Sequence, residues 1–127
     1  MLQEMLDKQN ELQLRLGTDI RNMSEENVAK FIKEHVVYMN NEVAEMLEEL
    51  PFFKPWKDYS GMSSADMLIA ATKARKEWID VLHFFMNISL ALGFDADTLY
   101  YMYMDKNSAN HKRQDDGYDH TQRHLDS

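Results

Sequence analysis

Four successive segments of this chain repeat apolar residues at the spacing of an α-helix. Residues that start or stop helices separate the segments, and the four glycines and two prolines are too few for the many turns of a sandwich or barrel. The segments are residues 2–16, a stretch from Ser24 to Pro51, a stretch from Ser63 or Ser64 to about Leu92, and one that begins near Asp97. The pattern predicts an all-α fold, an antiparallel bundle of four to five helices.

The 127 residues suffice for one domain, and their composition is close to that of a globular protein. Past Arg113 the chain becomes polar, so we expect a folded domain over residues 1–118 and a loose tail over residues 119–127. Two of the predicted helices are long for so small a domain. Because such helices often complete their core against another subunit, we expect a homodimer.

The formal net charge of −8 argues against broad binding to a nucleic-acid polymer, which needs a basic face. The chain has no cysteine, and it has no run of about 18 apolar residues that could span a membrane. The opening MLQEMLDKQ lacks the pattern of a signal peptide. We therefore expect a cytoplasmic protein with no membrane partner, located in the host cytoplasm if a phage encodes it.

Two pairs of acidic residues border the apolar stripes of the second and third predicted helices, Glu42 with Glu45 and Glu77 with Asp80. If these helices pack side by side, four carboxylates converge, and such a group needs protons or cations between its charges. Carboxylates in a chain without cysteine favour Mg²⁺ or Mn²⁺, and Mg²⁺ usually completes its shell with substrate phosphates. The spacing thus predicts a site for phosphate chemistry. The alternative is a solvated acidic surface, which helices often have.

The motifs resemble a known family. The stretches NEVAEMLEEL (41–50), the FKPWK loop (53–57) and EWIDVLHFFMN (77–87) carry the signature E-x-x-E, a spacer, then E-x-x-D-x-x-H-F. The opening MLDKQNELQLRL (5–16) and the ending KNSANHKRQDDGY (106–118) also match. Together they resemble the all-α, MazG-like nucleoside triphosphate pyrophosphatases. Within them, the chain is most similar to the dimeric dUTPases and the phage dCTP/dUTP pyrophosphatases.

The resemblance implies that Glu42, Glu45, Glu77 and Asp80 hold Mg²⁺ at the triphosphate, with Mn²⁺ possible, and that Glu42 activates the attacking water. The implied reaction converts a deoxynucleoside triphosphate and water into the monophosphate and pyrophosphate, a step that removes unwanted nucleotides. We expect dUTP as the substrate. The same chemistry on dCTP or on a purine nucleotide is the alternative, because base selectivity depends on few groups.

Three polar residues near the chain's end, Lys106, Asn110 and Arg113, share one helix face and could clamp phosphate oxygens. Their spacing alone equally suits basic residues that compensate the dipole at a helix end. The family match favours the clamp. Tyr118, which follows them, either closes over the site or packs the tail.

The resemblance also favours four residues as contacts of the base. Trp56 could stack on it, and the amides of Gln9 and Asn87 could read its edge. His83 could orient Asp80, line the base pocket or lie in the core. Each of these residues has an alternative role in packing.

Two other classes of function remain open. A di-iron carboxylate bundle requires Glu-x-x-His on two helices, and only Asp80 with His83 approximates this motif. A non-catalytic helical interaction module would explain the helices and would give the acidic residues no catalytic role.

Overall fold

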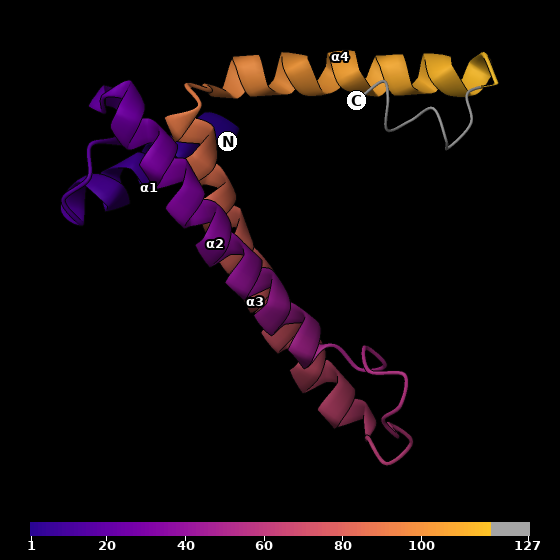
Figure 1. Ribbon diagram of the computed structural model, residues 1–127. Helices are drawn as coiled ribbons and strands as arrows, with labels where there is room; N and C mark the ends of the chain where they lie inside the picture. The colour runs from indigo at the N-terminus through magenta and orange to yellow at the C-terminus, as the bar shows by residue number, and fades with distance from the viewer. Residues whose placement is uncertain (118–127) are drawn as a thin grey trace. The chain divides into compact units, whose positions relative to one another are not determined.

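The computed structural model describes residues 1–117; Tyr118 and the predicted tail lie outside the described residues. This part of the chain is helical and contains no strand, which confirms the predicted all-α fold (Figure 1). In chain order the elements are α1 (Leu2–Arg15), a short 3₁₀ helix η1 (Ile20–Asn22), α2 (Glu25–Glu49), α3 (Ser64–Ala91) and α4 (Ala96–Asp115). Each predicted helix thus appears within one or two residues of its expected ends.

Side chains at the helix starts explain why these boundaries were predictable. Ser24 accepts a hydrogen bond from the backbone N–H of Asn27 at 3.3 Å. Ser63 and Asp66 form a reciprocal capping box, in which each side chain accepts a bond from the other residue's backbone N–H. Such caps satisfy N–H groups that have no partner within the helix, so they define where the helix begins.

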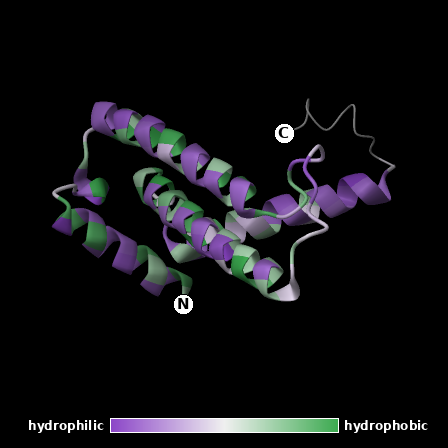
Figure 2. Ribbon diagram, turned by 90° about the horizontal axis from the view of Figure 1, so that it is seen from below, coloured by the Kyte–Doolittle hydropathy of each residue, from purple (hydrophilic) through white to green (hydrophobic). Residues whose placement is uncertain are grey.

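The chain divides into two compact units, Met1–Gly93 and Phe94–Ser127. In the first unit α2 and α3 form a long antiparallel hairpin, and α1 with η1 packs on α3 near the end of the hairpin opposite the 51–61 loop (Figure 1). The second unit consists of α4 among its described residues, and this helix begins with Asp95 as its cap. Hydrophilic and hydrophobic residues alternate along the helices (Figure 2). Burial follows hydropathy only in part, because Gln9, Asn10 and Gln13 of α1 are buried and no residue of α4 is.

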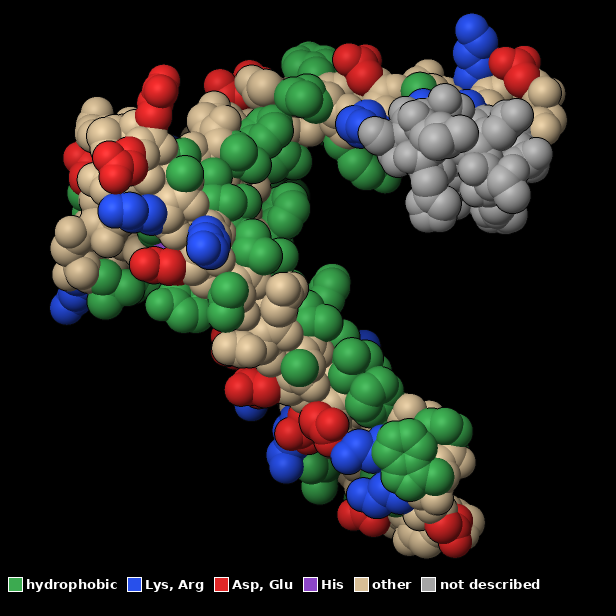
Figure 3. Space-filling view, in the orientation of Figure 1, with side chains coloured by type: hydrophobic (Ala, Val, Ile, Leu, Met, Phe, Trp, Pro, Cys, Tyr) green, Lys and Arg blue, Asp and Glu red, His purple; other side chains and the backbone are tan. Residues whose placement is uncertain are grey.

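The core of the first unit is small. Its buried apolar residues are Leu6, Ile20, Phe31, Ala74, Val81, Met86 and Leu90. The apolar stripe that predicts α3 includes Trp78 and Phe85, yet these two side chains are 53% and 45% exposed. Hydrophobic side chains therefore remain on the surface along the hairpin (Figure 3).

Two apolar grooves follow α3. One, of about 550 Å³, lies between α2 and α3 and is lined by Met46, Leu50, Ala71, Ala74, Arg75, Trp78 and Ile79. The other, of about 420 Å³, lies between α1 and α3 and shares Ile79 with the first. The single hairpin thus leaves one side of α3 incompletely covered.

Within residues 1–117 no single helix is long and apolar enough to cross a membrane. Counted together as one broken span, α3 and α4 have the required length and composition.

Candidate active site

The acidic residues of α2 and α3 come together, as the predicted helix packing requires. One carboxylate oxygen each from Glu42, Glu45 and Glu77 lies within 4.8 Å of the others. Because Glu42 and Glu45 are one helical turn apart and Glu77 faces them from the antiparallel helix, the cluster depends on the register of the hairpin. This register brings Glu77 into one site with Glu42 and Glu45, although Glu45 and Glu77 are 32 positions apart along the chain.

Glu42 and Glu77 are half-buried, and each has a fully buried oxygen, Oε2, with no hydrogen-bond partner. Two carboxylates cannot hydrogen-bond to each other, since neither has a proton to donate. When Glu42 is protonated it bonds to Glu77, and this bond, with burial and the charges of Glu45 and Asp80, raises the pKa of Glu42 to about 7. Repulsion and burial therefore disfavour full ionisation of the cluster when no counter-ion is bound.

Asp80, the fourth carboxylate that the sequence predicted, is not part of this group of three. Its side chain is exposed on α3, one turn after Glu77, and its charge acts on Glu42. Convergent carboxylate oxygens without thiolates suit a hard divalent cation such as Mg²⁺, and the two buried, partnerless oxygens are the groups that such an ion would satisfy. The donor set and its geometry thus fit the metal that the sequence implied.

A second polar cluster lies between α1 and α3. The side-chain amide of Gln9 donates to Asn87 Oδ1 at 2.8 Å, and both residues are buried. Asn10 and Gln13 are buried on the same face of α1, and Asn10 Oδ1 has no hydrogen-bond partner. Buried amides in an apolar helix interface are costly unless they serve a ligand or each other.

The sequence analysis did not identify Asn10 or Gln13 as site residues. The signal was present, because Gln9, Asn10 and Gln13 all fall on the face of α1 that carries Leu6. Polar residues on an otherwise apolar helix face indicate a site, and Asn10 lies on the same face as Gln9 and Gln13.

The amide cluster and the carboxylate cluster lie on one side of α3. Asp80 and Asn87 are seven residues apart, so they are separated by roughly 20° around the helix and about 10 Å along it. This spacing is comparable to the distance between the phosphates and the base in an extended nucleotide.

Trp56 lies far from this region. The 51–61 loop joins α2 to α3, and Asn87 is 23 residues beyond the first residue of α3, which corresponds to about 35 Å along the helix. Trp56 and the Gln9–Asn87 pair therefore cannot contact the same base within one copy of the chain. Trp56 itself is 80% exposed.

His83 is exposed and lines the groove between α1 and α3 together with Gln9. It therefore does not lie in the core, which was one of the three roles left open for it. The other lining residues are Glu4, Met5, Lys8, Leu12, Ile79, Leu82 and Met86.

In the second unit, Lys106, Asn110 and Arg113 follow one another on α4 at intervals of four and three residues, so they share a face as predicted. Arg113 Nη1 donates to Asn110 Oδ1 at 3.0 Å. Two cationic side chains and an amide on one face suit the oxygens of a phosphate.

Comparison with known proteins identifies the family of the chain. A family model described as dUTPase matches residues 1–96 and 85–118. A dCTP pyrophosphatase of Enterobacteria phage LZ5 is 32% identical over 141 aligned positions, which cover 92% of this chain and 82% of that protein. A dCTP pyrophosphatase of Enterobacteria phage T4 is 28% identical with the same coverage. No solved structure matches the chain significantly.

The matched regions contain both acidic pairs, the amides of α1 and α3, and the polar face of α4. The chain therefore belongs to the dUTPase family, and it is a nucleoside triphosphate pyrophosphohydrolase similar to the dCTP pyrophosphatases of phages.

Proposed function

We propose that the protein uses Mg²⁺ to hydrolyse a pyrimidine deoxynucleoside triphosphate, dUTP or dCTP, to its monophosphate and pyrophosphate. The cluster of Glu42, Glu45 and Glu77 carries this proposal, because its buried, partnerless oxygens suit a divalent cation and it lies in the region that the family model matches. The two phage relatives are dCTP pyrophosphatases, which supports dCTP as the substrate, and the dUTPase family supports dUTP.

In this proposal Glu42, Glu45, Glu77 and Asp80 hold the metal. When bound, Mg²⁺ would neutralise the charge that develops on the phosphate oxygens. Glu42 accepts the proton of the attacking water, whose oxygen forms the new bond to phosphorus as the bridging P–O bond between the α- and β-phosphates breaks.

We assign the base to the buried amides. Asn87 and Gln9 can each offer a donor and an acceptor, and the buried oxygen of Asn10 is available to a base N–H. The polar face of α4, with Lys106, Asn110 and Arg113, is assigned to the phosphates, and Tyr118 to closure over them. His83 lines the adjacent groove and is proposed to contact the nucleoside.

The active form is proposed to be a homodimer. The grooves on α3 are lined largely by apolar residues, and Trp78 and Ile79 in them are about half exposed, which a second copy of the hairpin would cover. A second copy would also supply a Trp56 to a site that the first copy's loop is too distant to reach.

Sedimentation should therefore show a dimer at micromolar concentration. Ile79→Glu places a charge where the two apolar grooves meet, and it should shift the protein to a monomer. Ala29→Glu adds the same charge at an exposed position near the start of α2 and should leave the dimer intact. A monomeric wild-type protein would contradict the assignment.

Substrate profiling tests the activity itself. With Mg²⁺ present, we expect dUTP and dCTP to yield monophosphate and pyrophosphate at least 10-fold faster than purine deoxynucleotides, because buried amides discriminate by hydrogen bonding. Equal rates on all bases would contradict the assignment of the amides, and no turnover of any nucleotide by the folded protein would refute the proposed function. If a phage encodes the chain, its substrate pool is that of the host cytoplasm.

A further inference from the structure

The loop between α2 and α3 has a defined conformation in spite of its exposure. Phe52 has a φ of 66°, in the left-handed region that a phenylalanine adopts only at a cost. Phe52 is also 69% exposed, so burial does not hold it there. Contacts within the loop must therefore maintain this backbone.

Tyr59 provides those contacts. Its ring packs against the ring of Phe52 with the centroids 5.2 Å apart. Its hydroxyl oxygen accepts a hydrogen bond from the backbone N–H of Lys54 at 3.2 Å. The ammonium group of Lys57 lies 5.8 Å from the centre of the same ring, within the range of a cation–π interaction. One half-buried side chain thus contacts the loop at three points on both sides of Trp56.

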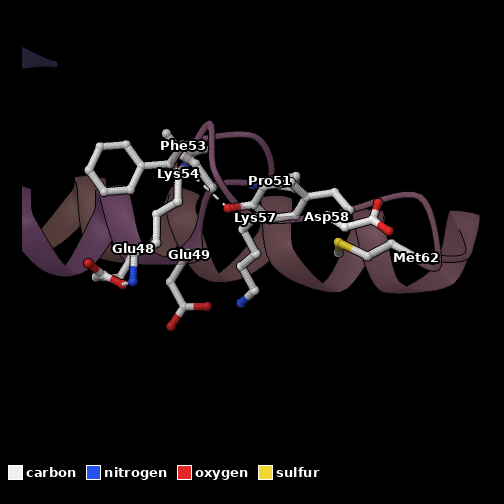
Figure 4. A pocket seen from close by; sticks show the side chains of 10 residues that line it. Glu48, Glu49, Pro51, Phe53, Lys54, Lys57, Asp58 and Met62 are labelled. Carbon is white, nitrogen blue, oxygen red and sulfur yellow. Dashed lines mark hydrogen bonds and ion pairs between the residues drawn. The ribbon is translucent and has the colours of Figure 1, made fainter.

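Tyr59, Lys54 and Lys57 also border a cavity of about 250 Å³ at the end of α2. Within it Lys54 pairs with Glu48 at 2.9 Å, which ties the loop to the helix. The side chains of Lys57 and Glu49 extend to one side of this cavity (Figure 4). Among residues 1–117 Lys57 forms no ion pair with an acidic residue. Its ammonium group is oriented instead by the ring of Tyr59.

We propose that Tyr59 is a positioning residue, which holds the 51–61 loop in the conformation that presents Trp56 and Lys57 to the nucleotide bound by a second copy of the chain. Residues that fix a ligand-binding loop in advance spare it the ordering cost on binding. That the ligand is a nucleotide rests on the proposed function. That Tyr59 holds the loop rests on the contacts of Tyr59 alone.

The test uses Trp78→Phe as a background, in which Trp56 is the sole tryptophan of the chain. Tyr59→Leu removes the ring and the hydroxyl, whereas Tyr59→Phe removes only the hydroxyl. Tyr59→Leu should lower the fluorescence anisotropy of Trp56 and raise KM for dUTP or dCTP by about 3–10-fold, with kcat changed less than about twofold. Tyr59→Phe should give a smaller change of the same kind. Tyr101→Leu, in the exposed part of α4, is the matched control and should change neither quantity.

An unchanged anisotropy in Tyr59→Leu, with helicity intact by circular dichroism, would overturn the holding role. A lower anisotropy with an unchanged KM would overturn the link to the nucleotide. If the wild-type protein hydrolyses no nucleotide, the proposed function fails, yet the anisotropy of Tyr59→Leu still decides whether Tyr59 orders the loop.

Discussion

Replacing Glu42 by glutamine should abolish most of the activity while making the metal-free protein more stable. The amide removes a metal ligand and the proposed base, so kcat/KM should fall by about 10²–10³-fold. At the same time, the new NH₂ group can donate to the partnerless oxygen of Glu77, and one of several clustered charges disappears. A residue present for function at the expense of stability is expected to behave in this way.

The gain in stability should depend on pH in a definite direction. The pKa of Glu42 is raised from 4.5 to about 7, so the folded protein binds more protons than the unfolded chain between these values. The contribution of Glu42 to the free energy of unfolding therefore falls as the pH rises through this window. Above pH 7 the full destabilising contribution of the ionised Glu42 applies. The free energy of unfolding of Glu42→Gln should then exceed that of the wild type by about 1–3 kcal/mol, a range that allows for partial screening of the half-buried site by water.

Urea denaturation of both proteins without metal at pH 5 and pH 8 measures this difference. Glu34→Gln, at an exposed position on the same helix, is the control and should change stability little at either pH. An equal effect of Glu42→Gln at both pH values would show that charge repulsion in the cluster is not the cause. Full activity in Glu42→Gln would remove Glu42 from the proposed mechanism.

Mg²⁺ should raise the melting temperature of the wild-type protein by roughly 10 °C at pH 7.5 when its concentration is about 100 times the dissociation constant. The ion would satisfy the buried oxygens of Glu42 and Glu77 and offset the repulsion between the carboxylates. At pH 5.5 the shift should be smaller, because Glu42 must lose a proton before it can bind the ion.

The control for this shift is NaCl at equal ionic strength, because salt alone screens the repulsion within a chain of net charge −8. Glu77→Gln should lose most of the Mg²⁺-specific shift and keep the effect of NaCl. If Glu77→Gln responds to Mg²⁺ as the wild type does, the ion binds elsewhere.

The helices were predictable because their signals are local. Ser24, Ser63 and Asp95 cap the helices that follow them, and the apolar spacing between caps and breakers sets the lengths. The acidic pairs were predictable for the same reason, because residues three apart project from one face of any helix. Whether the two pairs meet was a separate question that no local pattern could answer.

Two features of the site depended on long-range packing. The pairing of Gln9 with Asn87 joins residues 78 positions apart, and neither amide by itself indicates the other. The distance between Trp56 and this pair is a consequence of how long the antiparallel helices are and where α1 docks on them. The exposure of Trp78 and Phe85 is of the same kind, because a stripe predicts an apolar face and not what covers it.

The sequence by itself determined the all-α class, the ends of the helices and the residue types available for chemistry, because capping and periodicity act within a few residues. The tertiary structure decided which of these residues meet. The antiparallel register of α2 and α3 places Glu77 against Glu42 and Glu45, and a shift of one turn would separate them. The raised pKa of Glu42 follows from that register, since repulsion and desolvation depend on distance and burial rather than on sequence.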